Sequence, residues 1–287
     1  MKSNLFIVGA AKSGTTSFHS YLNQHPSIEM STVKETNFFS SEDVLNDDLY
    51  YNDAPLIKTI EEYNSLFFIK KNVKFYGESS VSYLFYPRVA NRIKDYNDNS
   101  KVVIFLRNPI ERSYSHFLMD YTAGYFSLSF KELLENPSLN EKAYQQSILQ
   151  SLYFNQVKKF IDVFGLEKVK IIILEEYQFN NELIINELET FLGVFHFKNY
   201  SFTKMNSYSY SNNWIIKYFY RSQFVKRFFR KLLNKKKITL IKSIFLKSSK
   251  PNIDTDCEIF LKKLFKSDVV KLSNLLNKDL NSIWNIK

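Results

Sequence analysis

The fold is decided by NLFIVGAAKSGTT (Asn4–Thr16), which opens the patterned part of the chain. Its apolar run over 4–8 predicts a buried strand, and a short polar loop follows over 10–14. After the loop, Phe18 and Leu22 lie four residues apart, which predicts a helix that ends before Pro26. Strand, tight loop and helix in this order are the first unit of a sheet covered by helices.

The loop has the composition of an anion-binding site. The N-terminus of a helix presents backbone N–H groups to an anion, and here Lys12 adds a cation while Ser13, Thr15 and Thr16 add hydroxyl donors around Gly14. A structural turn of the same composition is the alternative interpretation. The usual triphosphate-binding loop requires Lys directly after its second Gly, and Thr15 occupies that place.

The rest of the chain repeats the alternation of strand and helix. Apolar runs predict further strands over 74–77, 101–106 and 169–174. Helical spacing of apolar residues predicts helices from Asn108-Pro109 onward, over 148–164, over 183–192 and near the end of the chain over 269–284. This alternation predicts one α/β domain over residues 1–287, with a central parallel sheet flanked by helices.

A second candidate site follows the strand over 101–106. Arg107 stands where that strand ends, and the carboxyl ends of strands in open α/β sheets are where ligands bind. Ser115 comes about two turns into the following helix, so Arg107 and Ser115 can hold one phosphate from two sides. An ion pair between Arg107 and Glu111, with a solvated Ser115, is the alternative, and the sequence leaves both open.

The composition excludes several classes of protein. The 287 residues are 45% hydrophobic and 17% aromatic, which is typical of a folded globular chain and not of a disordered one. One Cys and four His give no reason to expect a disulfide or a structural zinc site, so we expect no metal. No apolar run approaches the ~18 residues of a membrane span, and none has the form of a signal peptide. We therefore expect a cytoplasmic protein.

The positive charge is concentrated in one segment. Residues Thr190 to Ile253 contain no Asp or Glu but 14 of the 39 Lys and Arg residues of a chain whose net charge is +10. Aromatic residues interleave with these cations, and 221–247 is compatible with a helix. The segment predicts an anionic partner, either an acidic glycan or the inner surface of an anionic membrane, and not nucleic acid. A solvated surface is the alternative.

Several motifs in this order resemble the carbohydrate and heparan-type branch of the sulfotransferases, which use 3′-phosphoadenosine 5′-phosphosulfate (PAPS). Residues 6–26 are similar to the family's 5′-phosphosulfate loop and 102–117 to its 3′-phosphate motif. KETNFF (34–39) resembles the family's K-E-x-x-F-F segment, and GESSVSYL (77–84) resembles G-E-x-[ST]-P-x-Y-L with Val81 at the Pro position. The resemblance covers most of 4–193 and 248–287, whereas about 203–247 matches poorly.

The resemblance implies a reaction and a set of site residues. It implies a P-loop-like strand–loop–helix that binds PAPS without a metal and releases 3′,5′-diphosphoadenosine. Glu35 is then the base that deprotonates a hydroxyl or amine of the acceptor, which the resemblance implies to be a carbohydrate or glycolipid, and Lys12 stabilises the leaving phosphate. The residues implied to hold PAPS are Lys12, Ser13, Gly14, Thr15, Thr16, Arg107 and Ser115.

The histidines and two other classes of protein give alternative interpretations of the sequence. We expect structural or surface roles for the four histidines, His19, His25, His116 and His196. A P-loop-type kinase or NTPase shares the opening unit but needs Lys after the second Gly and a carboxylate that holds Mg²⁺. A basic protein that binds membrane surfaces explains the segment 190–253 but not Lys12, Glu35 and Arg107 together.

Overall fold

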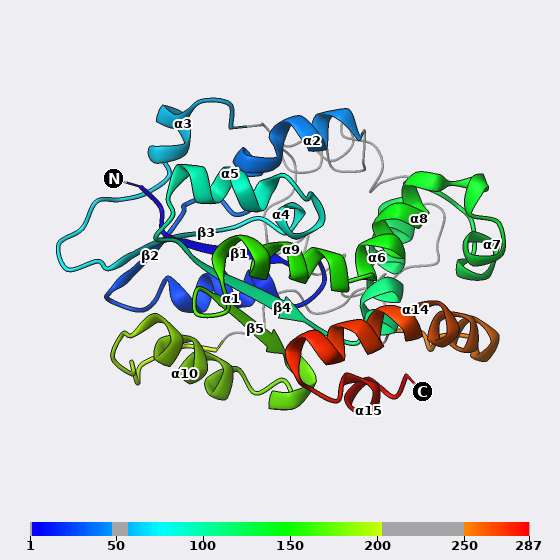
Figure 1. Cartoon of the computed structure of the whole chain (residues 1–287). Coiled ribbons are helices and arrows are strands. Elements are labelled where there is room, and N and C mark those ends of the chain that lie inside the picture. Colours follow the sequence, from blue (N-terminus) through cyan, green and yellow to red (C-terminus); the bar gives the residue numbers. More distant parts are fainter. Residues whose placement is uncertain (1, 48–56, 203–249, 287) are drawn as a thin grey trace, which may run out of the picture.

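In the computed structural model, which describes residues 2–47, 57–202 and 250–286, five strands form one fully parallel sheet (Figure 1). The order across the sheet is β2-β3-β1-β4-β5. The strands are β1 (Leu5–Gly9), β2 (Ile28–Met30), β3 (Phe75–Ser79), β4 (Lys101–Leu106) and β5 (Val169–Ile173). The predicted α/β class with a central parallel sheet is confirmed.

The central strand, β1, lies at the point where the chain changes direction across the sheet. Leu5 aligns with Gly77 of β3 on one side and with Lys101 of β4 on the other. Strands added on both sides of a central strand leave a crevice at its carboxyl end, where ligands of such sheets bind. The loop after β1 occupies this position.

Helices cover both faces of the sheet (Figure 1). One face carries α4 (Ser82–Phe85), α5 (Val89–Tyr96) and α9 (Phe154–Phe164), and the other carries α1 (Thr15–Leu22) and α10 (Asn181–Leu192). A further group, α6 (Pro109–Ala123), α7 (Phe130–Glu135), α8 (Glu141–Ser147), α14 (Thr255–Leu276) and α15 (Leu280–Trp284), extends beyond the ends of β4 and β5. Two short helices, α2 (Ser41–Asn46) and α3 (Ile60–Asn64), lie beside α5.

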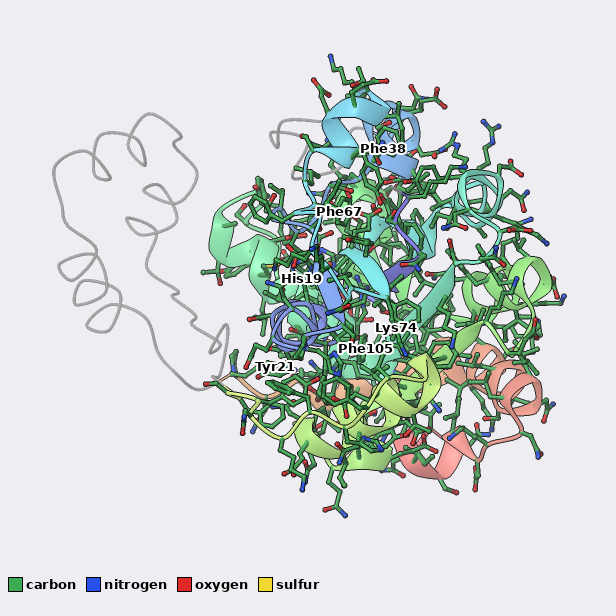
Figure 2. The ribbon with its side chains drawn as sticks, turned by 90° about the vertical axis from the view of Figure 1, so that its left-hand side faces the viewer. His19, Tyr21, Phe38, Phe67, Lys74 and Phe105 are labelled. Carbon is green, nitrogen blue, oxygen red and sulfur yellow. The ribbon has the colours of Figure 1, made fainter. Side chains whose placement is uncertain are left out.

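The two faces have separate aromatic cores. Figure 2 shows Phe38 and Phe67 on one side of the sheet and Tyr21 and Phe105 on the other. Phe105 stacks on Phe18 of α1 with ring centroids 4.4 Å apart. Because both faces are covered, β1 and most of β4 are buried on both sides and appear in the sequence as unbroken apolar runs, whereas β3 (FYGES) contains the buried polar residues Glu78 and Ser79.

The start of α6 is capped by the residues from which the sequence predicted a helix. The Asn108 side chain accepts hydrogen bonds from the N–H groups of Ile110 at 2.9 Å and Glu111 at 3.4 Å, and Pro109 fills the first helical position. The helix ends at Gly124, which adopts the left-handed conformation. These capping preferences are local, so the sequence alone placed the start of this helix correctly; its end was not predicted.

Several elements differ from the predictions, and α2, α3, α4, α5, α7 and α8 were not predicted at all. The helix expected over 148–164 begins at Phe154, because Leu152 is extended after a short 3₁₀ turn, Leu149–Ser151. The helix expected over 269–284 is two helices, separated where Asn277 turns left-handed at φ 51°. The three-residue strand β2 was not predicted. The helix-compatible pattern over 221–247 lies outside the described residues.

Candidate functional site

The loop Ala10–Gly14 lies at the carboxyl end of β1, as predicted. Lys12 (φ 68°) and Gly14 (φ 79°) both adopt left-handed backbone conformations, and Gly14 caps α1 without any side-chain hydrogen bond. The N–H groups of Gly14, Thr15 and Thr16 donate to no residue in the part of the chain that the structure describes. The first turn of α1 therefore presents free N–H donors, which is the arrangement that binds anions.

Two arginines hold the carbonyl groups of this loop. Arg107 Nη1 donates to the Lys12 carbonyl at 3.2 Å, and Arg112 Nε donates to the Ala11 carbonyl at 3.2 Å. Arg112 is fully buried on α6, where Nη1 also donates to the Ser147 carbonyl at 2.9 Å and to Ser151 Oγ at 3.0 Å. Both arginines therefore fix the loop through its carbonyls. All five N–H groups of Arg112 have partners in the protein, whereas Arg107 Nε has none among the described residues. Sequence reasoning missed Arg112.

Two buried polar atoms at the loop have no partner within the described residues. Ser13 is fully buried, and neither its Oγ nor Arg107 Nε makes a hydrogen bond there. An unsatisfied buried donor costs roughly 1–3 kcal/mol, so such atoms are retained where a ligand satisfies them. Together with the free N–H groups, Ser13 and Arg107 fit the phosphate and sulfate oxygens of an anionic nucleotide.

Lys12 places its ammonium group in a poor environment for a charge. Burial is the largest cause that lowers its pKa to about 8; Asp120 opposes this shift, and the cations Arg112, Arg107 and Lys34 add to it. Its Nζ donates to Met119 Sδ at 3.2 Å, and a thioether is a weak acceptor. A bound anion would offer Lys12 a stronger partner than any it has here.

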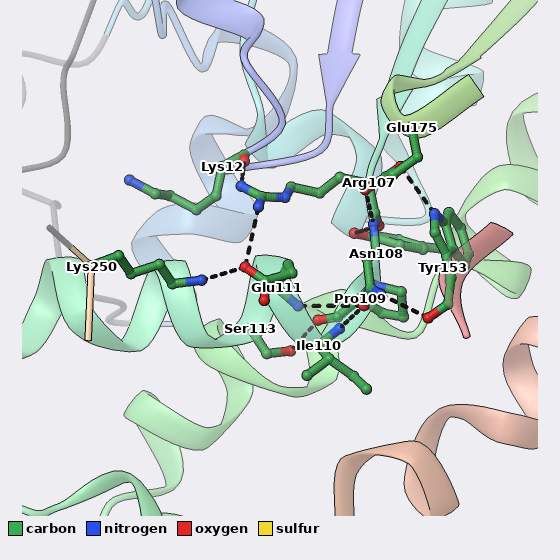
Figure 3. A network of polar contacts seen from close by, with 11 residues as sticks. Lys12, Arg107, Asn108, Pro109, Ile110, Glu111, Ser113, Tyr153, Glu175 and Lys250 are labelled. Atoms are coloured by element: carbon green, nitrogen blue, oxygen red, sulfur yellow. Dashed lines mark hydrogen bonds and ion pairs between the residues drawn. The ribbon is translucent and has the colours of Figure 1, made fainter. Parts of the chain in front are cut away.

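Arg107 is part of a chain of charges at the carboxyl end of β4 (Figure 3). Its Nη2 lies 3.5 Å from Glu111 Oε2, and the same oxygen forms an ion pair with Lys250. The alternative pairing that the sequence left open is thus present. Ser115 is half-buried on α6 and makes no hydrogen bond to Arg107. Sequence reasoning placed Lys250 in the basic segment and not at this site.

A second set of contacts fixes the backbone at Arg107 and Asn108 (Figure 3). The Asn108 N–H donates to Glu175 Oε1 at 2.8 Å, and Trp284 Nε1 donates to the other oxygen of Glu175 at 3.0 Å. The Tyr153 hydroxyl donates to the Arg107 carbonyl at 3.2 Å. Arg107 therefore leaves the strand at a point held by the 3₁₀ turn that follows β5 (Leu174–Tyr177), by the N-cap residue of α9 and by α15.

Glu35 lies at the carboxyl end of β3, the neighbour of β1. It adopts a left-handed conformation (φ 61°), and its N–H donates to the Ser79 carbonyl at 2.9 Å. Its carboxylate accepts from the Val81 N–H at 2.8 Å and pairs with Lys34, and 34% of the side chain remains exposed. Lys34 links the two candidate residues electrostatically, because it pairs with Glu35 and its charge also contributes to the lowered pKa of Lys12.

Two histidines, which lie near the cations described above, are held neutral. Burial and the charge of Lys34 lower the pKa of His19 to about 4, and its Nε2 lies 3.1 Å from the Ser31 carbonyl. Burial and the charges of Arg112 and Lys12 place the pKa of His116 well below its usual range. Among the described residues, no group of three or more His, Cys, Asp or Glu side chains could hold a metal ion.

Comparison with known proteins gives consistent matches. Residues 2–268 match the family model described as "Sulfotransferase domain". The chain is 32% identical over 138 residues to the membrane-associated sulfotransferase kil1 of Dictyostelium discoideum, covering 47% of this chain and 25% of that protein. It is 26% identical over 196 residues to a bifunctional heparan sulfate N-deacetylase/N-sulfotransferase of Caenorhabditis elegans, covering 63% of this chain and 21% of that protein.

A solved structure matches the whole fold. The crystal structure of a sulfotransferase from Alicyclobacillus acidocaldarius superposes with a TM-score of 0.69 at 28% identity, and the match covers 99% of both chains. By contrast, the chain spans only a quarter or less of the length of the two curated relatives described above, at 25% and 21%.

Proposed function

Because this chain belongs to the sulfotransferase family, we propose that it transfers a sulfuryl group from PAPS to a hydroxyl or amine of an acceptor, most suitably a carbohydrate or glycolipid. The observation that carries this proposal is the loop after β1. Within the described part of the chain, the N–H groups of Gly14, Thr15 and Thr16 and the Ser13 hydroxyl have no partner, and the loop carries Lys12. The donor, the acceptor and the residue roles below belong to the proposal.

The donor would be held at two places. The N–H groups of Gly14, Thr15 and Thr16, with Ser13 Oγ, suit the 5′-phosphosulfate. Arg107 Nε has no partner among the described residues, and Ser115 is proposed to join Arg107 on the 3′-phosphate. In this role Arg107 would exchange its long contact with Glu111, at 3.5 Å, for a phosphate. When bound, PAPS supplies the activated sulfuryl group.

The transfer needs one proton acceptor and one cation. As the acceptor oxygen or nitrogen attacks sulfur, the bond between sulfur and the phosphate oxygen breaks, and negative charge develops on that oxygen. Lys12 stabilises this charge in a buried setting where electrostatic interactions are strong. Glu35 takes the proton of the acceptor, and its partial exposure keeps it reachable. Binding and orientation supply most of the remaining rate.

The relatives support a carbohydrate acceptor. Several are named as heparan sulfate N-sulfotransferases, enzymes whose name specifies an amine on a polysaccharide. The match is confined to a part of those proteins, so the acceptor of this chain is inferred by class only. The kinase alternative has no support from the comparisons, since the family model, the relatives and the matching crystal structure are all sulfotransferases.

Two measurements test the proposal. Thermal shift with 3′,5′-diphosphoadenosine in the presence of a chelator should stabilise the protein, whereas ATP with Mg²⁺ should stabilise it little. Incubation with ³⁵S-labelled PAPS and a panel of glycans, glycolipids and small alcohols should then yield a labelled product and release 3′,5′-diphosphoadenosine. Stabilisation by ATP and Mg²⁺ alone would contradict the proposal and favour a kinase.

We also propose a cytoplasmic location with peripheral attachment at the inner membrane surface. The support is the acid-free segment 190–253, of which residues 203–249 lie outside the described residues. No helix in the described ranges is both long and apolar enough to span a bilayer. Fractionation of cells that express the protein, with and without a high-salt wash, tests the location.

A further inference from the structure

A fully buried carboxylate, Glu78 of β3, lies beneath the loop that carries Glu35. Glu78 is completely inaccessible, and four hydroxyl groups donate to it. Its Oε1 accepts from Tyr83 at 2.8 Å and from Tyr63 at 3.1 Å, while its Oε2 accepts from Ser80 at 3.3 Å and from Thr36. Because no solvent or substrate reaches it, Glu78 cannot act as the base itself.

The same hydroxyl groups hold the backbone of residues 35–39. The Asn37 N–H donates to Ser80 Oγ at 3.1 Å, and the Phe39 N–H donates to the Tyr83 hydroxyl at 3.2 Å. Thr36, next to Glu35 in the chain, is itself buried and bonds to Glu78 and, at 3.1 Å, to the Tyr83 hydroxyl. Each contact that Glu78 makes on this side therefore ends on the loop of Glu35.

The loop needs such an anchor because its backbone is unusual. Glu35 (φ 61°) and Asn37 (φ 50°) are both left-handed without being glycine. Such conformations cost of order 1 kcal/mol or more each and persist only where surrounding contacts impose them. The loop contains no glycine that would relieve this cost.

We propose that Glu78 is a positioning residue that holds the Glu35 loop in its active conformation through the hydroxyl groups of Thr36, Tyr83 and Ser80. This inference rests on the proposed function only where it concerns turnover. Burial raises the pKa of Glu78 and the four hydroxyl donors lower it, and burial prevails, so that the net pKa is about 7. A carboxylate that is costly to bury is thus tolerated because several strong hydrogen bonds satisfy it.

Hydrogen exchange tests the positioning without any assumption about the reaction. Thr36→Val and Tyr83→Phe each remove one hydroxyl between Glu78 and the loop, whereas Tyr63→Phe removes one that reaches Glu78 from α3. In the full-length protein, the first two should speed exchange of the amides of Glu35, Asn37 and Phe39 by roughly tenfold. Tyr63→Phe should leave these amides unchanged, and Thr36→Ser should restore wild-type exchange. Equal acceleration by Tyr63→Phe, or none by Thr36→Val and Tyr83→Phe, overturns the inference.

Turnover gives the second test. Thr36→Val and Tyr83→Phe should lower kcat by roughly 10- to 100-fold, because small displacements of a catalytic group are costly, with the KM for PAPS nearly unchanged. In a Glu35→Gln background the same changes should lower kcat no further. A loss of equal size in that background overturns the positioning role while the proposed function stands. Wild-type turnover in Glu35→Gln instead removes Glu35 from the proposed function, and the exchange data still decide the positioning.

Discussion

Lys12 shows at the scale of one residue how burial prepares a site for an anion. Its ammonium group is held among Arg107, Arg112 and Lys34, and its pKa falls to about 8. A group with a lowered pKa loses its charge as the pH rises through that value, so Lys12 is cationic below pH 8 and largely neutral above it. A bound phosphosulfate would favour the cation and raise the pKa again.

The first prediction concerns pH and nucleotide binding. The affinity for 3′,5′-diphosphoadenosine should be flat below about pH 8 and fall by up to about tenfold per pH unit above it, because binding requires a proton on Lys12. Isothermal titration calorimetry in buffers of different ionisation enthalpy would show proton uptake. Lys12→Met should abolish the pH dependence. An equally steep fall in Lys12→Met would assign it to another group.

Lys12 should matter still more for turnover. Lys12→Ala should lower kcat more than it weakens nucleotide binding, since the charge counts most when the leaving oxygen becomes negative. Lys12→Arg should also turn over more slowly, because a planar guanidinium does not replace the compact charge of an ammonium group. Steady-state kinetics with PAPS measures the turnover of both variants. Unchanged turnover in Lys12→Ala would remove Lys12 from the mechanism.

Arg107 is predicted to distinguish two nucleotides. Arg107→Ala should weaken the binding of PAPS far more than the binding of adenosine 5′-phosphosulfate, because only PAPS carries the 3′-phosphate. Competition binding with both nucleotides measures the difference, and Ser115→Ala should act in the same direction more weakly. An equal loss for both nucleotides would show that Arg107 acts only by holding the Lys12 carbonyl, at 3.2 Å.

Glu35→Gln keeps the size of the side chain and can still accept from the Val81 N–H, but it cannot take a proton. We expect a folded protein that binds PAPS normally and turns over more slowly by a factor on the order of 10²–10⁴. Thermal unfolding and nucleotide binding are the controls for fold and site. Near-normal turnover would assign the base to another group, and the burial of Glu78 excludes it from that role.

At the scale of elements, the strand ends hold the site together. The loop after β1 is fixed by arginines that follow β4, and the loop after β3 supplies the partner of Glu35 at Val81. Gly9 at the end of β1 also has a packing reason, because an added Cβ would lie 2.7 Å from Leu84 Cβ on α4. The neighbouring strands thus fix the loop after β1 and the candidate base Glu35 relative to each other.

Glu78 gives a prediction about stability at this scale. Its pKa is raised to about 7, so the folded state binds its proton more tightly than the unfolded state does. This group's contribution is therefore fully present at pH values below the ordinary Glu pKa and is lost as the pH rises towards 7. Glu78→Gln should reduce the decline in unfolding free energy between pH 5 and pH 8. Denaturant unfolding at both pH values measures it, and an unchanged decline would show that Glu78 is not the group responsible.

At the scale of the whole molecule, the match to the crystal structure covers 99% of this chain, and the described part of the basic segment 190–253 is 190–202 and 250–253. Charge reversal of Lys235, Lys236 and Lys237 should raise the KM for an acidic acceptor and flatten its salt dependence, with PAPS binding intact. If the partner is a membrane, the same variant should instead fail to sediment with anionic vesicles. Parental behaviour in both assays would identify a solvated surface.

The sequence by itself determined the parts that depend on neighbouring residues. The strand–loop–helix at 4–22, the capped start of α6 and the alternation that makes the sheet parallel are all written in local apolar spacing and in Gly, Asn and Pro positions. The family motifs also named Lys12, Glu35 and Arg107 as candidates. Lys12 and Arg107 follow predicted strands as well, whereas Glu35 was a candidate through the family resemblance alone.

Only the tertiary structure decided how those residues are held. Arg112 reaches the Ala11 carbonyl from 101 residues away, Glu78 meets Thr36 across 42, and Lys250 meets Glu111 across 139. No local pattern encodes such contacts, because a hydrogen bond between distant segments depends on the sheet order and on which side chains are buried together. The same reason explains the break at Asn277, whose left-handed turn lets α15 fold back so that Trp284 reaches Glu175.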